Sequence, residues 1–145
     1  MADPRHRVIW LTGQSGAGKT TLAKALRPKL QAIVLDGDEM RTSISEGLGF
    51  SKEDREEHNL RVARLARALS HQTPVIVSVI APFASTRRKL DDILKPTWVY
   101  VKRSSLLAEK DKPYEEPTNA HIVVDSDMHT TAEQVKIILR YLTVL

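Results

Sequence analysis

The segment from Gly13 to Thr20 constrains the fold of this chain more than any other feature of its sequence. It reads G-Q-S-G-A-G-K-T and matches the pattern G-x-x-x-x-G-K-[ST]. In that pattern the glycines let backbone N–H groups surround phosphate oxygens, the lysine places a charge at the β- and γ-phosphates, and the threonine hydroxyl can bind Mg²⁺. The apolar run 8–12 and the helical stretch 19–29 supply the strand and helix that this phosphate-binding loop (P-loop) requires. The expected nucleotide-binding residues are Gly13, Ser15, Gly16, Ala17, Gly18, Lys19, Thr20 and Thr21.

Short apolar runs alternate with helical stretches along the whole chain. The runs are rich in Val and Ile and predict five strands, at 8–12, 32–36, 75–80, 98–102 and 121–124. Besides 19–29, helical spacing of apolar residues predicts a helix at 54–71 and another near the C-terminus, with Thr130 or Thr131 as its N-cap. Alternation of this kind predicts an α/β fold with a five-stranded parallel sheet and helices on both faces. Ligands of such sheets bind at the carboxyl ends of the strands.

The length and composition of the chain exclude several classes of protein. A length of 145 residues favours a single domain over 1–145, and the absence of Cys excludes disulfides and zinc–thiolate sites and suits a cytoplasmic protein. No apolar run approaches the roughly 18 residues of a membrane span, and residues 1–7 lack the apolar segment of a secretory signal. The net charge of +4 is small and the seven aromatic residues are scattered, so we expect neither a nucleic-acid partner nor a membrane partner.

Two acidic residues lie at the end of the second expected strand. Asp36 is its last residue, and Gly37 and Asp38 come directly after it. Two carboxylates beside a P-loop suit two tasks: holding Mg²⁺ through water, and accepting a proton from an attacking hydroxyl. A structural alternative is an Asp-Gly turn in which Asp38 caps a short helix. The neighbouring P-loop favours the functional interpretation, in which Arg41 could hold an anionic acceptor.

Several further motifs follow in order along almost the whole chain, and with them the sequence resembles the adenylylsulfate (APS) kinases. The pair D-G-D-x-x-R and G-F-S-x-x-D-R is more specific to that family than the P-loop is. The resemblance implies a P-loop NTPase fold and ATP-dependent phosphorylation, with Mg²⁺, of the ribose 3′-hydroxyl of adenosine 5′-phosphosulfate to give PAPS. Homodimers are common in that family. The matching segments are 11–23, 35–38 with Arg41, 48–51 with 54–55, 80–82 with Arg87, 99–101 and 114–117.

The resemblance also implies roles for individual residues. Asp38 would be the base on the acceptor hydroxyl, Lys19 the charge on the phosphates, and Asp36 would support Asp38 or bind the metal together with Thr20. The acceptor would be bound by Arg41, Phe50, Arg55, His58, Ile80, Ala81, Pro82 and Lys112. For Phe50 the structural alternative is ordinary core packing, and for Arg55 it is a solvated charge on a helix.

The chain departs from the family pattern at two single positions. His58 stands where the family has Asn, with Asn59 following, and its alternative role is an exposed histidine on a helix face. Ala81 replaces the serine of an Ile-Ser-Pro motif, which excludes a phosphoserine intermediate at that position and favours direct in-line transfer.

The largest departure lies in the region 104–117, where most of the family's lid is absent. Lys112 matches either the lid lysine or a residue before the later Tyr-Glu-x-Pro motif, and no second Phe is available for the acceptor base. A shortened lid predicts a more open site, weaker binding of APS or a different acceptor, and more hydrolysis of ATP without acceptor. The alternatives to a kinase are a nucleotide-binding module with little catalytic activity and a nucleic-acid binder, whose affinity would fall steeply with salt.

Overall fold

The structure, a computed structural model, describes residues 7–144. Residues 1–6, on which the expectation about a secretory signal mostly rests, lie outside this range. Within the described part of the chain, no helix combines the length and the apolar composition that crossing a membrane requires.

Five strands form one parallel sheet in the order β2-β3-β1-β4-β5. This confirms the predicted α/β fold, and the ends of the predicted strands are shifted by at most two residues. The strands are β1 (Val8–Thr12), β2 (Ile33–Asp36), β3 (Val75–Ser78), β4 (Thr97–Lys102) and β5 (Ile122–Asp125).

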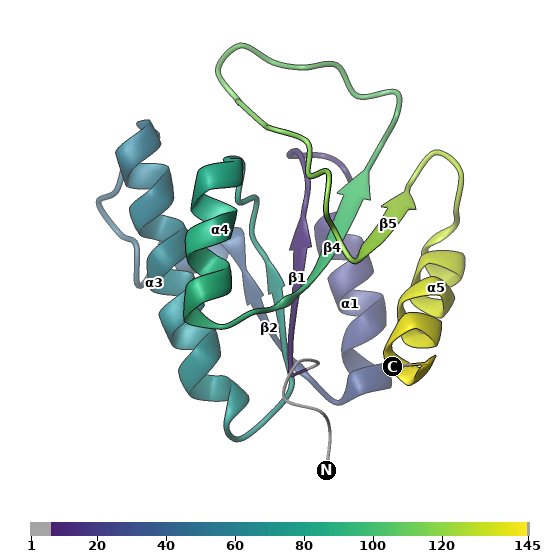
Figure 1. Cartoon of the computed structure of the whole chain (residues 1–145). Coiled ribbons are helices and arrows are strands. Elements are labelled where there is room, and N and C mark those ends of the chain that lie inside the picture. Colours follow the sequence, from purple (N-terminus) through teal and green to yellow (C-terminus); the bar gives the residue numbers. More distant parts are fainter. Residues whose placement is uncertain (1–6, 145) are drawn as a thin grey trace.

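Helices cover both faces of the sheet (Figure 1). α1 (Lys19–Leu30) and α5 (Thr131–Val144) pack on one face over Ile9, Leu11 and Ile76, while α3 (Lys52–Ser70) and α4 (Ala84–Ile93) pack on the other, over Trp10, Val75 and Val77. The short helix α2 (Gly37–Arg41) follows β2 directly. The continuous apolar runs of β1 and β3 are thus explained, since both sides of these strands are covered.

Local capping explains two of the helix boundaries. Thr130, and not Thr131, is the N-cap of α5: its Oγ1 accepts a hydrogen bond from the N–H of Glu133, and Glu133 Oε1 accepts one from the N–H of Thr130. Ser51 caps α3 in the same way, through the N–H of Asp54. Both helices therefore begin at a signal that is readable in the sequence.

Helix α4 was not predicted, and its cap explains why. Phe83, the residue before it, makes no side-chain capping bond. Instead Glu115, from a distant segment, accepts a hydrogen bond at Oε1 from the N–H of Ala84 (2.8 Å). The start of α4 is thus stabilised by tertiary structure, which a local pattern does not reveal.

The carboxyl ends of the strands share one edge of the sheet (Figure 1). The P-loop follows β1 there, α2 follows β2, and residues 79–83 follow β3. The connection 103–121 between β4 and β5 rises above the same edge as a long loop. Every motif singled out in the sequence therefore lies at or near this edge, where parallel sheets bind ligands.

Candidate active site

The P-loop runs from β1 into α1, and its three glycines stand where the structure disfavours a side chain. A Cβ on Gly13 would lie 2.1 Å from the carbonyl oxygen of Val101 in β4, so only glycine fits beside that strand. Gly16 and Gly18 have φ angles of +86° and +104°, in the left-handed region that side chains disfavour. The loop is therefore shaped by the absence of side chains, which lets its N–H groups surround an anion.

Lys19 is almost completely buried at the start of α1. Its Nζ donates hydrogen bonds to the carbonyl oxygens of Gly13 and Gln14, both at 2.8 Å. Burial lowers the pKa of Lys19 to about 8, and the charge of Asp36 acts in the opposite direction. The ammonium group is thus held inside the P-loop, where a bound phosphate would replace the carbonyl groups as its partner.

Asp36 connects the P-loop with α2. Its Oδ1 accepts a hydrogen bond from the hydroxyl of Thr20 at 3.5 Å, and its Oδ2 accepts one from the N–H of Asp38 at 3.1 Å. Asp36 is therefore the N-cap of α2, and the alternative that Asp38 is that cap is wrong. The carboxylate of Asp38 makes no hydrogen bond within the described part of the chain, so it is free to accept a proton.

Thr20 and Asp36 fit a magnesium ion. Both offer hard oxygen donors, and cis ligands of an octahedral Mg²⁺ lie about 3 Å apart, close to the observed separation. Within residues 7–144, no group of three or more His, Asp or Glu side chains is arranged to hold a metal ion. A metal held by few protein ligands retains several waters, as Mg²⁺ usually does beside phosphates.

One cavity of about 820 Å³ brings most of the predicted site residues together. Its size lies in the upper part of the range for small-molecule sites, roughly 300–1,000 Å³. Both Asp36 and Asp38 line it, so the acidic pair faces the mouth of the P-loop. The other predicted residues on its wall are Ser15, Gly16, Gly18, Lys19, Thr20, Thr21, Arg41, Phe50, Arg55, His58, Ile80, Ala81 and Pro82.

Three predicted residues do not line this cavity. Gly13 and Ala17 shape the P-loop from behind, since Ala17 is buried and Gly13 faces β4. Lys112 lines a neighbouring cavity of about 440 Å³ and forms an exposed ion pair with Glu109 at 3.4 Å. The two cavities are adjacent, because they share wall residues, namely Ser15, Phe50, Arg55 and Ile80.

Phe50 lies against two arginines. The guanidinium carbons of Arg41 and Arg55 lie 4.6 Å and 5.4 Å from the centre of its ring. Each arginine is also anchored to backbone, Arg41 to the carbonyl of Gly49 (2.7 Å) and Arg55 to that of Phe50 (2.8 Å). The ring is 70% exposed, so the alternative of core packing is wrong.

His58 is buried, and the alternative of an exposed histidine is also wrong. It is only 4% exposed, and its Nδ1 shares a hydrogen bond of 2.7 Å with the hydroxyl of Ser45. Burial is the main cause that lowers the pKa of His58 to about 4, and the charges of Arg41 and Arg61 act in the same direction. The side chain is therefore neutral at pH 7.

Comparison with known proteins decides the family. The family model for adenylylsulphate kinase matches residues 5–110. The adenylyl-sulfate kinase of Deinococcus deserti is 37% identical over 166 positions, covering 95% of this chain and 92% of that protein. The chain belongs to the adenylylsulfate kinase family. It is thus a P-loop kinase, a phosphotransferase, as the sequence motifs predicted.

Two further relatives agree with this assignment. The probable adenylyl-sulfate kinase of Archaeoglobus fulgidus is 38% identical over 148 positions, covering 83% of this chain and 96% of that protein. The structure of the Mycobacterium tuberculosis APS kinase CysC in complex with AMPPNP and APS superposes with a TM-score of 0.84 at 27% identity, covering 97% of this chain and 99% of that chain. The similarity therefore extends over nearly the whole fold.

In this member of the APS kinase family, residues 80–82 form a strained wall of the main cavity. Ala81 is fully buried and has a φ of 38°, in the left-handed region. Its carbonyl oxygen accepts hydrogen bonds from Arg87 Nη1 (2.7 Å) and from Thr12 Oγ1 (3.4 Å). Arg87 and Thr12 thus hold the backbone of this wall in place, although the sequence assigned no role to either.

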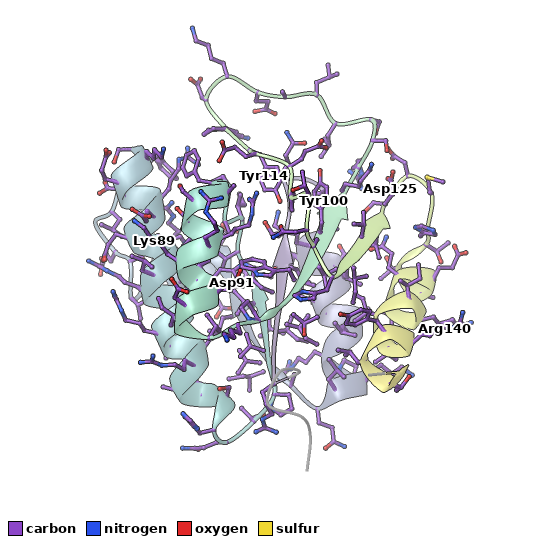
Figure 2. All side chains as sticks on the ribbon, in the orientation of Figure 1. Lys89, Asp91, Tyr100, Tyr114, Asp125 and Arg140 are labelled. Carbon is purple, nitrogen blue, oxygen red and sulfur yellow. The ribbon has the colours of Figure 1, made fainter. Side chains whose placement is uncertain are left out.

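Tyr114 fastens the β4–β5 connection to the end of β1. Figure 2 shows Tyr114 beside Tyr100 at the carboxyl edge of the sheet, and their rings stack with centres 5.9 Å apart. The hydroxyl of Tyr114 also shares a hydrogen bond of 2.8 Å with the hydroxyl of Thr12. The same threonine therefore contacts both the connection and the wall that Ala81 forms.

Glu115 joins the connection directly to that wall. Its backbone N–H donates a hydrogen bond to the carbonyl of Pro82 at 2.8 Å. This backbone contact, together with the cap that its side chain places on α4, links the two segments at two points. Both contacts are long-range, and the sequence signalled them only through the family motif at 114–117.

The connection also touches the side of the cavity that Phe50 and Arg55 line. Arg55 Nη2 donates a hydrogen bond to the carbonyl of Asp111 at 3.2 Å. Leu107 is 83% exposed, and with Phe50 it lines the cavity that Lys112 lines. The loop therefore forms a partial cover beside the main cavity.

Proposed function

We propose that this chain transfers the γ-phosphoryl group of ATP, with Mg²⁺, to the 3′-hydroxyl of adenosine 5′-phosphosulfate (APS), giving PAPS. The observation that carries the proposal is one cavity that holds a P-loop, two carboxylates, two arginines and an exposed aromatic ring. Membership of the APS kinase family supports the choice of APS as acceptor.

The P-loop residues, with Lys19, bind the β- and γ-phosphates of ATP. Lys19 lies where its charge stabilises the phosphoryl group as it moves, which is a leading contribution to catalysis in such transfers. Thr20 and Asp36 would hold Mg²⁺, which when bound neutralises negative charge on the phosphates. Asp36 also orients Asp38 by capping α2.

Asp38 is the base in this proposal. Its free carboxylate accepts the proton of the acceptor hydroxyl, the hydroxyl oxygen forms a bond to the γ-phosphorus, and the bond from that phosphorus to the bridging oxygen of ADP breaks. No protein nucleophile is required. Ala81 offers none at the position of the family's serine.

The acceptor lies at the other end of the cavity. Arg41 and Arg55 bind its anionic groups, and the exposed face of Phe50 stacks on its base. Because the two arginines already hold the ring of Phe50, little side-chain entropy is lost when the base binds. The remaining predicted residues of this wall are His58, Ile80, Ala81 and Pro82.

The lid in this proposal is shortened in the region 104–117. The family match ends at residue 110, within the β4–β5 connection, which supports this. The alignment with the Deinococcus protein has 166 positions and covers 95% of this chain of 145 residues, so that protein has residues without a counterpart here. Lys112 lines the neighbouring cavity, which shares Phe50 and Arg55 with the main one. A cytoplasmic location and a homodimer remain predictions.

A coupled assay of the purified protein tests the proposal. ATP with Mg²⁺ is offered with a panel of acceptors that includes APS, and the product is identified by mass spectrometry. We expect PAPS and ADP in equal amounts. Binding of ATP without any transfer would instead indicate the nucleotide-binding module, and transfer to another acceptor would correct the substrate.

A further inference from the structure

Arg87, in the first turn of α4, is a charged side chain in the interior of the protein. It is only 7% exposed, and in the part of the chain that the structure describes it forms no ion pair. Its guanidinium instead donates hydrogen bonds to two backbone carbonyls, Nη1 to that of Ala81 and Nη2 to that of Glu115, both at 2.7 Å. A buried charge is costly unless it is well bonded, so the two carbonyl groups that it joins indicate its task.

The two carbonyl groups belong to segments that are far apart in the sequence. Ala81 is part of the wall of the main cavity, and Glu115 lies at the end of the β4–β5 connection. The guanidinium carbon of Arg87 also lies 5.6 Å from the centre of the ring of Tyr114. The N–H of Glu115 donates back to the carbonyl of Pro82 at 2.8 Å. These four contacts join the wall and the connection into one unit, with Arg87 at its centre.

The conformation of Ala81 needs this support. Its φ of 38° lies in the left-handed region, which a residue with a side chain keeps only when its surroundings hold it there. Its carbonyl oxygen is held by Arg87 and, at 3.4 Å, by the hydroxyl of Thr12. Neither Arg87 nor Thr12 lines the main cavity, whereas residues 80–82 do. The two side chains therefore hold the wall from outside the cavity and act on a bound molecule only through that wall.

We infer that Arg87 is a positioning residue: by fixing Ala81 and Glu115 to one another, it keeps the wall of residues 80–82 in the shape that the phosphoryl acceptor fits. This inference rests on the proposed function for the identity of the acceptor, APS. The task requires the planar fork of a guanidinium, because two of its nitrogens reach two carbonyl groups at once. A lysine at this position keeps the charge and loses the fork.

Arg87→Lys tests the inference in two ways. Because one of the two carbonyl bonds is lost, we expect the KM for APS to rise at least about fivefold, with the KM for ATP within about twofold of the wild type. In the protein without ligands, hydrogen exchange at the N–H of Glu115 should become at least about tenfold faster, since that group is bonded to the wall at Pro82. Steady-state kinetics measure the first quantity, and NMR measures the second.

Two further variants separate positioning from stability. Ala81→Gly in the Arg87→Lys background should return the KM for APS to within about twofold of the wild type, because glycine adopts a φ of 38° without strain. Thr12→Val keeps the shape of the side chain and removes the weaker bond to Ala81, so we expect the KM for APS to rise about threefold. Thr12→Val also tests the inference if Arg87→Lys does not fold.

Two positions on α4 supply controls. Arg88, the next residue, is exposed, so Arg88→Gln removes a charge and should leave both KM values and the exchange at Glu115 unchanged. Ile93 packs against the core and does not line the main cavity. Ile93→Ala should therefore lower the Tm and leave the KM for APS unchanged.

The outcomes separate this inference from the proposed function. A KM for APS that changes in Arg87→Lys no more than in Ile93→Ala would make Arg87 a structural contact alone and overturn the inference. Unchanged exchange at Glu115 would also overturn it, as would an unchanged KM in Thr12→Val if Arg87→Lys does not fold. If the wild-type protein leaves APS unmodified, the proposed function fails, while the exchange at Glu115 still decides whether Arg87 positions the wall.

Discussion

The two ends of the main cavity are built in different ways. At the phosphate end, one continuous run from Gly13 to Thr20 supplies the loop, the lysine and the hydroxyl. At the acceptor end, the wall comes from α2, from the segment after it with Phe50, from α3 and from residues 80–82. The first end is a property of local sequence, whereas the second exists only when distant segments meet.

This difference leads to different expectations for variants. Changes in the P-loop, or to the two carboxylates that lie between the ends, remove charge stabilisation or proton transfer, so they should reduce kcat. Changes at the acceptor end weaken one wall among several, so they should raise the KM for the acceptor and leave ATP binding intact. The following experiments test this division, from the largest expected effect to the smallest.

Lys19→Ala should have the largest effect. It removes the charge that stabilises the migrating phosphoryl group, so we expect kcat to fall by at least about a hundredfold. Steady-state kinetics with ATP and APS measure the loss. Lys24→Ala, on an exposed position of the same helix, is the control and should behave like the wild type. Turnover near the wild-type rate in Lys19→Ala would refute the role of this lysine.

Asp38→Asn should separate binding from chemistry. We expect ATP affinity within about tenfold of the wild type and a fall of about a hundredfold in transfer to the acceptor, because the amide does not accept the proton. Calorimetry with a non-hydrolysable ATP analogue measures the first quantity, and product formation measures the second. A more severe loss of transfer in Asp36→Asn than in Asp38→Asn would exchange the roles of the two carboxylates.

Phe50→Ala tests the acceptor end. We expect the KM for APS to rise about tenfold through lost stacking, with the KM for ATP unchanged. Because the ring is 70% exposed, the unfolding free energy should change by no more than about 0.5 kcal/mol. Kinetics with each substrate varied in turn measure the first effect, and denaturant titration measures the second. Equal rises in both KM values would contradict the division of the cavity into two ends.

His58 predicts a pH dependence of stability. Its pKa of about 4 in the folded protein lies below the value of about 6.5 for a free histidine, so the unfolded chain binds the proton first as pH falls. The stability from neutral His58 is therefore complete above about pH 6.5 and is lost as the pH falls toward 4. We expect a loss of about 2 kcal/mol after solvent screening, measured by denaturant titration across this range. His58→Gln should lose less stability over the same range, and an identical pH profile would contradict the assignment.

The predictions from sequence succeeded where the structure depends on neighbours in the chain. The five strands, the P-loop between β1 and α1, and an N-cap at Thr130 or Thr131, which the structure shows to be Thr130, each follow from contiguous residues. They left the surroundings of a side chain open: the structure shows that the alternatives of an exposed His58 and of Asp38 as a helix cap are wrong, since His58 is buried and Asp36 caps α2. Helix α4 was not predicted because its N-terminus is capped by Glu115, which lies far from it in the sequence.

The amino-acid sequence by itself determined the parallel α/β fold, the phosphate-binding loop and the acidic pair, because short-range hydrogen bonds, glycine conformations and the periodicity of apolar residues decide these features. Only the tertiary structure decided that two arginines contact an exposed Phe50 and that Thr12 and Arg87 support Ala81. The physical reason is that burial and long-range hydrogen bonds depend on which segments pack together, and that depends on the whole chain.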